Sequence, residues 1–421
     1  MVWFVIIAGI LSLFGGIGIF AALGYTAELA AWVMGTPLTA IIQACHGALY
    51  KEVWLAIPLF ILAGYLMLES GATRELVDLI NAFLGRMRAG LALVAIVTCG
   101  FFGACSGSIL SAVAAIGTIM IPMMADQGYD KRFSAALISV AAVLAMLIPP
   151  SNIFIIYCGV TATPIGHQFL AGIIPGFLLM ALLYIAVLLS PARKIRGTRV
   201  FIGKEKLSAL YHALPILGMP VVILGGIYGG ICTAVEAAAA ACWYVTLIGF
   251  LVYRRLNVKG VVNALRATVK LTSIIFMLVI MAYGITAIFT ILRVPTGMAN
   301  IAMGLGQIGF LLVVTLIMLF LGLFLEAVAA MVVIVPVMWA AVLAFGLSPL
   351  YFGVIICTGA AIGYSTPPVC LNLYTAASVS GLLPMEVARE IPRFLIAIIL
   401  ACIICLFFPI LSTFLPGLVY G

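Results

Sequence analysis

The chain has 421 residues, of which 66% are hydrophobic and only 8% charged, and its mean hydropathy is +1.36. A soluble domain carries about 25% charged residues, so this composition excludes a cytosolic enzyme, a secreted disulfide scaffold and a nucleic-acid-binding domain, and no nucleic-acid partner is expected. We therefore expect an all-α protein that crosses a lipid bilayer several times. The net charge of +8 becomes a guide to topology, because Lys and Arg collect in cytoplasmic loops.

Apolar runs follow one another along the whole chain, and a spanning helix needs roughly 20 such residues. The runs at 89–125 and 300–344 are so long that each is expected to fold back on itself as a re-entrant hairpin. The run at 27–48 is weak, and whether it spans the membrane or lies in the interface is left open. The runs lie near residues 3–23, 27–48, 53–68, 89–125, 133–163, 168–191, 212–230, 234–253, 271–292, 300–344, 350–379 and 394–415.

The basic residues predict which ends of these runs face the cytoplasm. One basic loop covers 193–206 and a second covers 254–270, with two runs between them, so both can lie on the same side. Counting spans outward from these loops places eighteen of the twenty Lys and Arg in the cytoplasm. Lys51 and Arg293 are the two that are expected outside.

The two halves of the sequence share a spacing of glycine and proline. Each half reads as a helix, a hairpin, a loop with glycine and a helix broken by Pro-Pro, and the charge argument turns the two hairpins toward opposite sides. This predicts an inverted repeat, an arrangement that many secondary transporters use to build a site at the bilayer midplane; chance alignment of Gly and Pro is the alternative. The expected units are a first repeat 1–191 (hairpin about 89–125, broken helix about 133–163), a cytoplasmic basic loop 192–211, and a second repeat 212–415 (hairpin about 300–344, broken helix about 350–379).

The turn of the first hairpin carries Ser106, Gly107 and Ser108. A Ser-Gly-Ser turn presents hydroxyls and backbone groups, which in lipid must be paired or line a cavity. We interpret it as a tip that offers oxygens to a cation and a helix N-terminus to an anion. A packed turn whose serines satisfy one another is the alternative.

The two Pro-Pro breaks carry further oxygen ligands. Two adjacent prolines remove two N–H donors and free the carbonyls one turn earlier, and unwound backbone is where transporters hold Na⁺. Kinks that serve packing alone are the alternative. The candidate residues are Pro149, Ser151 and Asn152 at the first break and Ser365, Thr366 and Asn372 around Pro367-Pro368.

Glu326 lies at the turn of the second hairpin, shortly after Gly322, with no Lys or Arg near it in sequence. It is expected to act as a cation ligand, a proton carrier or a gate, or else as a carboxylate near the surface. Glu236 instead completes a capping box with Thr233 and is assigned a structural role. No hydrolase, zinc or nucleotide-binding motif is present, so no enzymatic activity is expected.

At these residues the sequence resembles the large membrane subunit of the TRAP (tripartite ATP-independent periplasmic) transporters. The resemblance covers nearly the whole chain, and no single stretch of it is decisive. The matching stretches are Ile57-Pro58-Leu59-Phe60-Ile61-Leu62-Ala63-Gly64, Ser106-Gly107-Ser108 with Ala114-Ala115-Ile116-Gly117, Ile148-Pro149-Pro150-Ser151, Leu170-Ala171-Gly172-Ile173-Ile174-Pro175-Gly176, and Thr366-Pro367-Pro368-Val369 with Leu371-Asn372-Leu373.

The resemblance implies an ion-transporter-superfamily fold that works as an elevator in the bacterial inner membrane and imports organic acids with Na⁺. It also implies two partners, a periplasmic substrate-binding protein and a small four-helix membrane subunit. The small subunit is fused to the large one in some members, but we expect no room for it in 421 residues. Glu326, where sialic-acid-type members carry Asp, resembles the dicarboxylate branch, as does the stretch from Val113 to Gly117. Ala112, where those members also carry Asp, and Cys370, where Gly is usual, depart from the family pattern.

Together these arguments place Na⁺ at the first tip and break (Ser106, Ser108, Pro149, Ser151) and at the second (Gly322, Glu326, Ser365, Thr366). The substrate is expected between the tips, near Ser106, Gly107, Ser108, Asn152, Thr366 and Asn372. A stand-alone Na⁺- or H⁺-coupled carboxylate transporter that needs no binding protein is the alternative.

Overall fold

The computed structural model describes residues 18–195, 203–367 and 370–420, and every regular element within these ranges is helical. Eight of the described helices are long and apolar enough to cross a membrane, or nine if the bent pair near the C-terminus forms one span. The prediction of an all-α polytopic membrane protein is confirmed. Three predicted features lie outside the described residues: the start of the run at 3–23, Arg196 and Arg199 in the basic loop, and Pro368 in the second break.

The N-terminal helices differ from the predicted runs. Helix α2 (Ile19–Met34) continues beyond residue 23, and α3 (Leu38–Leu49) begins only after a turn, so the run at 27–48 is not one helix. Gly35 ends α2 with a φ of +65° and donates its N–H to the carbonyls of Ala31 and Trp32. Pro37 then precedes α3. Mean hydropathy could not locate this turn, because the residues on both sides of it are apolar.

Both long runs fold back on themselves as helical hairpins, as predicted. The first consists of α6 (Gly90–Ser106) and α7 (Ile109–Asp126), and the second of α14 (Val294–Phe324) and α15 (Ala327–Ala344). Helix α14 begins six residues earlier than the predicted run and is kinked at Gly306, which has a φ of 70° and a ψ of 167°. That the hairpins re-enter on one side of the membrane stays a prediction.

Each hairpin is followed by a broken helix. The first consists of α8 (Lys131–Ala141), the 3-10 segment η2 (Ala142–Met146) and, after the prolines, α9 (Asn152–Thr161). The second consists of α16 (Pro349–Ser365) and α17 (Leu371–Ser380). Hairpin and broken helix thus occur in the same order in both halves, while the bounds of the two repeats and their inversion stay predictions.

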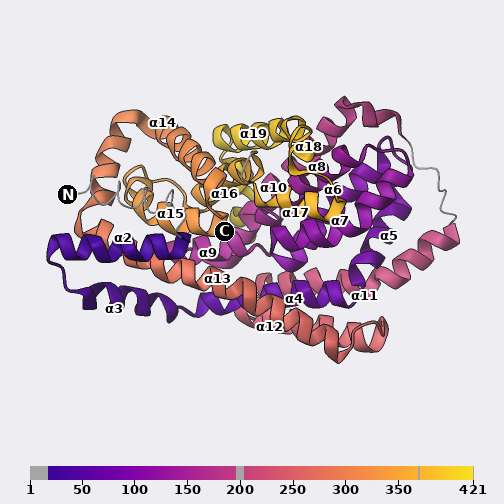
Figure 1. Cartoon of the computed structure of the whole chain (residues 1–421), viewed down its shortest axis with the longest axis horizontal. Coiled ribbons are helices and arrows are strands. Elements are labelled where there is room, and N and C mark those ends of the chain that lie inside the picture. Colours follow the sequence, from indigo (N-terminus) through magenta and orange to yellow (C-terminus); the bar gives the residue numbers. More distant parts are fainter. Residues whose placement is uncertain (1–17, 196–202, 368–369, 421) are drawn as a thin grey trace.

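Four of the remaining helices, α4 and α11 to α13, form a layer along one side of this bundle, and the others close its outer faces. Long helices of the layer, α4 and α11 to α13, run side by side along the lower edge of Figure 1, where α4 packs against α12 and α13. The elements are η1 (Glu52–Leu55), α4 (Ala56–Glu69), α5 (Ala72–Leu84), α10 (Ile165–Leu189), η3 (Pro191–Lys194), α11 (Gly203–Tyr228), α12 (Ala234–Leu247), the π-helical turn η4 (Ile248–Val252), α13 (Val258–Ile291), α18 (Pro384–Ala388), α19 (Ile391–Phe407) and α20 (Ile410–Tyr420).

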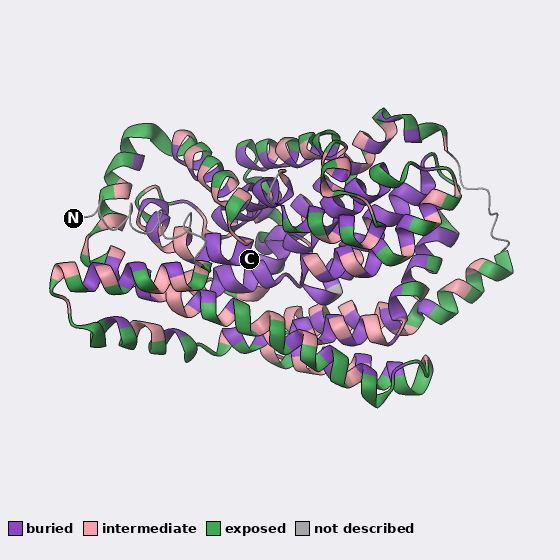
Figure 2. Cartoon of the chain, in the orientation of Figure 1, coloured by how far each residue is buried: buried purple, intermediate pink, exposed green. Residues whose placement is uncertain are grey.

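The second half of each broken helix packs against the hairpin of the other half of the chain. Helix α9 contacts α15, and α17 contacts α7. Figure 2 shows that these elements form the buried centre, whereas the layer helices carry much exposed surface. Large apolar side chains such as Val221 and Trp243 lie on that surface, as expected for helices that face lipid. The crossing of the halves brings both hairpin tips to the centre of the molecule.

Candidate functional site

The first hairpin tip is a tight turn closed by its own serines. Gly107 takes a φ of +58°, which favours glycine, and ends α6, while Ser108 is the N-cap of α7. The Ser108 hydroxyl accepts from the Ser111 N–H at 3.4 Å and from the Ser111 hydroxyl at 3.1 Å. Ser106 Oγ lies 3.4 Å from both the N–H and the carbonyl of Ser108. The tip is therefore preformed, and the hydroxyls that were predicted as ligands also hold its shape.

The second hairpin tip is held by a close approach of backbones. Gly322, near the end of α14, faces Gly363 of α16 so closely that a Cβ on Gly322 would lie 2.9 Å from the Gly363 Cα. Glu326 then occupies the N-cap position of α15, and its side chain forms no capping hydrogen bond. The carboxylate is thus left for another role.

One cavity joins the two tips. It is lined by Gly107 and Ser108 from the first tip, by Glu326 and Ala327 from the second, and by Asn152 from the start of α9. We call it the tip cavity. A second, more apolar cavity lies between the tip of the second hairpin and helices α2 and α13. Residues of both hairpin tips thus line the tip cavity, as the expectation of a substrate between the tips requires. Glu326 lines this cavity and the second one.

Three helix N-termini meet at the tip cavity. The first residues of α7, α9 and α15, which are Ile109, Asn152 and Ala327, all line it. A helix N-terminus carries a partial positive charge and free N–H groups. The described residues that line the cavity include neither Lys nor Arg. Backbone dipoles and hydroxyls are therefore the groups present to receive an anion there.

The carbonyls released by the prolines are largely bonded again by nearby side chains. Ser151 donates to the Met146 carbonyl at 2.8 Å and caps α9 through the Phe154 N–H. At the second break the Thr366 hydroxyl donates to the Ile362 carbonyl at 2.6 Å. These two carbonyls are therefore not free to bind a cation in this conformation, because hydroxyl side chains at the breaks donate hydrogen bonds to them.

Other oxygens at the breaks have no partner. Asn152 Oδ1, Ser365 Oγ and Asn372 Oδ1 are buried and form no hydrogen bond with the described residues. An unpaired buried acceptor costs about 1–3 kcal/mol, so breaks that keep such oxygens are suited to a cation or to water. Asn372 is held in place because its Nδ2 donates to the Ser139 carbonyl of α8 at 3.3 Å.

The structure thus divides the predicted site residues into groups. Gly107, Ser108, Asn152 and Glu326 line the tip cavity, and Gly322 lines the adjoining one. The others lie behind these residues in the turn and the breaks and do not line either cavity: Ser106, Pro149, Ser151, Ser365, Thr366 and Asn372.

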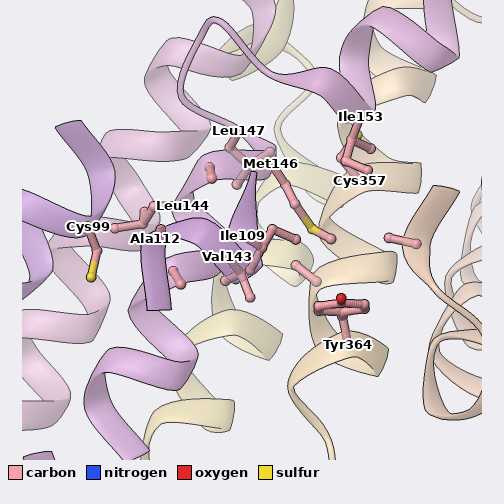
Figure 3. Packing of buried hydrophobic residues seen from close by; sticks show 14 of the residues in the cluster. Cys99, Ile109, Ala112, Val143, Leu144, Met146, Leu147, Ile153, Cys357 and Tyr364 are labelled. Atoms are coloured by element: carbon pink, nitrogen blue, oxygen red, sulfur yellow. The ribbon is translucent and has the colours of Figure 1, made fainter. Parts of the chain in front are cut away.

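The tip cavity is also lined by residues of three further helices, which we did not predict as site residues. Tyr364 of α16 lines both cavities, and Ile61 of α4 and Ile275 of α13 form the wall on the side of the long helices. Figure 3 shows Tyr364 in the buried cluster that also contains residues of the first half of the chain, among them Ile109, which lines the tip cavity with it. An aromatic residue directly before the Ser365-Thr366-Pro367 break was the available signal for Tyr364. Ile61 lies in one of the stretches that match the family, whereas Ile275 had no signal.

Comparison with known proteins gives the family. Residues 2–411 match the family described as "Tripartite ATP-independent periplasmic transporter, DctM component". The chain is 36% identical to the isethionate TRAP transporter permease DctMQ of Oleidesulfovibrio alaskensis over 98% of its own length, but it spans only 65% of that protein. It is 34% identical to the C4-dicarboxylate TRAP transporter large permease DctM of Vibrio cholerae, with 99% of this chain and 97% of that protein covered.

The fold has a counterpart among solved structures. The YdaH transporter of Alcanivorax borkumensis superposes with a TM-score of 0.65 over 88% of each chain at 14% sequence identity. The apolar helices and the family match agree on a multi-pass protein of the bacterial inner membrane that transports rather than catalyses. The chain belongs to the DctM family, the large permease component of the tripartite ATP-independent periplasmic transporters.

Proposed function

We propose that this permease imports a small organic acid, a dicarboxylate or a related carboxylate, together with Na⁺. The observation that carries the proposal is the tip cavity, in which Ser108 of one hairpin and Glu326 of the other face a common space. A site shared by two hairpins from different halves of the chain can exchange its access between the two sides of a membrane. In this proposal the substrate binds in the tip cavity.

An anionic substrate is supported by the charge of the cavity wall. The N-termini of α7, α9 and α15 supply partial positive charge. Asn152 Nδ2 and the Ser108 hydroxyl can add side-chain donors. Relatives named for C4-dicarboxylates and for isethionate, a sulfonate, share this chain's family, and the common chemistry of those names is a small organic anion.

Coupling to Na⁺ is supported by the donor set. Alkali and other hard cations take oxygen ligands, and the unpartnered oxygens of Asn152, Ser365 and Asn372 lie on the two broken helices. Glu326 and Asn152 would bring negative potential to the cavity that must also hold an anion, and Ser365 and Asn372 would bring it to the breaks behind the cavity. Cations bound there would offset the substrate's charge, so binding of the two would be cooperative.

The partners follow from the family. A component of a tripartite transporter works beside two others, which we propose are a periplasmic substrate-binding protein and a small four-helix membrane subunit. We further propose an elevator motion, in which the hairpins and broken helices move against the layer of α4, α11, α12 and α13 (Figure 1).

The test is uptake of a labelled acid into proteoliposomes that hold the permease and its two partners. Uptake is expected only with an inward Na⁺ gradient and with the binding protein outside, and a K⁺ gradient of equal size is the control. Uptake that continues undiminished without Na⁺ would reject the coupling. Uptake by the permease alone, driven by Na⁺ or H⁺, would favour the stand-alone alternative.

A further inference from the structure

The short helix α9 is fastened at its C-terminal end by residues from two other elements. Lys51 Nζ donates to the Gly159 carbonyl at 2.6 Å and to the Tyr283 hydroxyl at 3.0 Å. The Tyr283 hydroxyl in turn donates to the Gly159 carbonyl at 3.3 Å. The ammonium also lies 5.2 Å from the centre of the Tyr283 ring. A cation thus meets the negative end of α9, where carbonyls lack partners within the helix.

Trp54 closes the same place by packing. A Cβ on Gly159 would lie 2.6 Å from the Trp54 ring, so only glycine fits against it. The Trp54 indole N–H donates to the Ala48 carbonyl at 2.7 Å, and its ring meets Tyr283 edge to face. Trp54 is 1% exposed. We call Lys51, Trp54, Gly159 and Tyr283 the α9 clamp.

The clamp joins the elements that form the walls of the tip cavity. Helix α9 has ten residues, about 15 Å, and Asn152 at its other end lines the cavity. Tyr283 lies on α13, eight residues after Ile275 in the cavity wall, and Trp54 lies just before α4, which carries Ile61. Movement of α9 relative to α13 and α4 must therefore break the contacts of Lys51.

We propose that Lys51 is a positioning residue that fastens α9, and with it Asn152, to α13 in one state of the transport cycle and releases it in another. The proposal rests on the proposed function for the cycle, but the contact itself does not. Lys51 is one of only two basic residues expected outside the cytoplasm, so the clamp would act on the side where the substrate arrives.

The test measures the distance between α3 and the end of α9 by pulsed electron paramagnetic resonance in nanodiscs. Spin labels are placed at Gln43 and Thr163, with the half-exposed Cys45 and Cys232 replaced by Ala. We expect one dominant distance in the parent protein. Lys51→Met, which keeps most of the unbranched side chain but removes the ammonium, should add a longer distance in at least a third of the molecules. Lys51→Arg should restore the single distance.

Two further variants separate the clamp from general damage. Tyr283→Phe removes one hydroxyl and should give an intermediate distribution, whereas Arg293→Met, the other cation expected outside, should change nothing. A Lys51→Met distribution that superposes on that of Arg293→Met would overturn the proposal. In the uptake assay Lys51→Met should lower the maximal rate at least threefold. A changed distance in a protein that takes up no organic acid would instead count against the proposed function and leave the clamp standing.

Discussion

Ser151 and Cys370 make the same pair of hydrogen bonds in the two broken helices. Each is the N-cap of the second helical segment and accepts from the N–H three residues on, at 3.4 Å in both cases. Each also donates backward to a carbonyl before the prolines, Ser151 to Met146 at 2.8 Å and Cys370 to Tyr364 at 2.7 Å. The cysteine that departs from the family pattern therefore acts as a thiol version of the serine cap.

This equivalence predicts that Cys370→Ser is tolerated and Cys370→Ala is not. A serine hydroxyl can form both bonds, so the free energy of unfolding should stay within about 0.5 kcal/mol of that of the parent. The alanine variant loses the cap and leaves the Tyr364 carbonyl buried without a donor, which should cost about 1–3 kcal/mol. Thermal unfolding of the purified protein measures both, and Ser151→Ala should resemble Cys370→Ala. Equal stability of Cys370→Ser and Cys370→Ala would contradict the shared role.

The close approach of α14 and α16 predicts that Gly322→Ala is destabilising. The new Cβ would meet backbone atoms of Gly363, which cannot move aside as a side chain can, so overpacking should cost about 1–3 kcal/mol. Gly304→Ala on the same helix is the control, because a Cβ there meets nothing within 4 Å. Thermal unfolding should separate the two variants, and a Gly322 variant as stable as the Gly304 variant would mean that the helices can separate.

The contact between the first tip and α9 predicts a transport defect in Gly107→Ala. The added Cβ would lie 2.9 Å from Asn152 Cγ and would also be strained by the positive φ. Gly128→Ala is the matched control, since Gly128 has a φ of +86° and open space around it, so that variant carries only the strain of about 1–2 kcal/mol. Substrate affinity should fall at least tenfold in the Gly107 variant and stay unchanged in the Gly128 variant.

The place of Glu326 between the two cavities predicts that its charge matters for coupling. Glu326→Gln keeps the shape of the side chain and removes the anion, so the Na⁺ concentration for half-maximal uptake should rise at least tenfold. Glu326→Asp retains the charge, so its Na⁺ concentration for half-maximal uptake should lie between those of the parent and of Glu326→Gln. Uptake rates over a series of Na⁺ concentrations measure the effect. An unchanged Na⁺ dependence together with a lost pH dependence would assign Glu326 to proton transfer instead.

The turn of the first hairpin and the two breaks could be located because glycine and proline act locally. Gly107 and the Pro149 break interrupt a helix wherever the chain is placed, so the sequence alone locates them. The turn at Gly35 carried the same kind of signal, glycine followed by proline two residues on, but a count of apolar residues passes over it. Hydropathy and run length therefore predicted the membrane class and the hairpins, while local signals located the turns and breaks within the apolar runs.

The tip cavity could be predicted only in part. Ser108 and Glu326 stand out because they are polar residues inside apolar sequence, whereas Ile275 and Ile61 look like any other lipid-facing or packed side chain. The hydrogen bonds that the Ser151 and Thr366 hydroxyls donate to nearby carbonyls depend on the geometry of each break, which the spacing of the prolines does not specify. Likewise, nothing in the sequence joins Lys51 to Gly159, 108 residues further along the chain.

The packing of α9 on α15 and of α17 on α7 has a consequence for biosynthesis. When residue 161 leaves the ribosome, the surface that will cover α9 is still some 180 residues away, which takes roughly ten to forty seconds to synthesise at 5–20 residues per second. During that interval α15 cannot yet cover α9, so Asn152 lacks the wall that the second hairpin provides in the finished protein. Protection of this polar side chain by the insertion machinery or by lipid headgroups is therefore a requirement of making this protein, before any substrate reaches it.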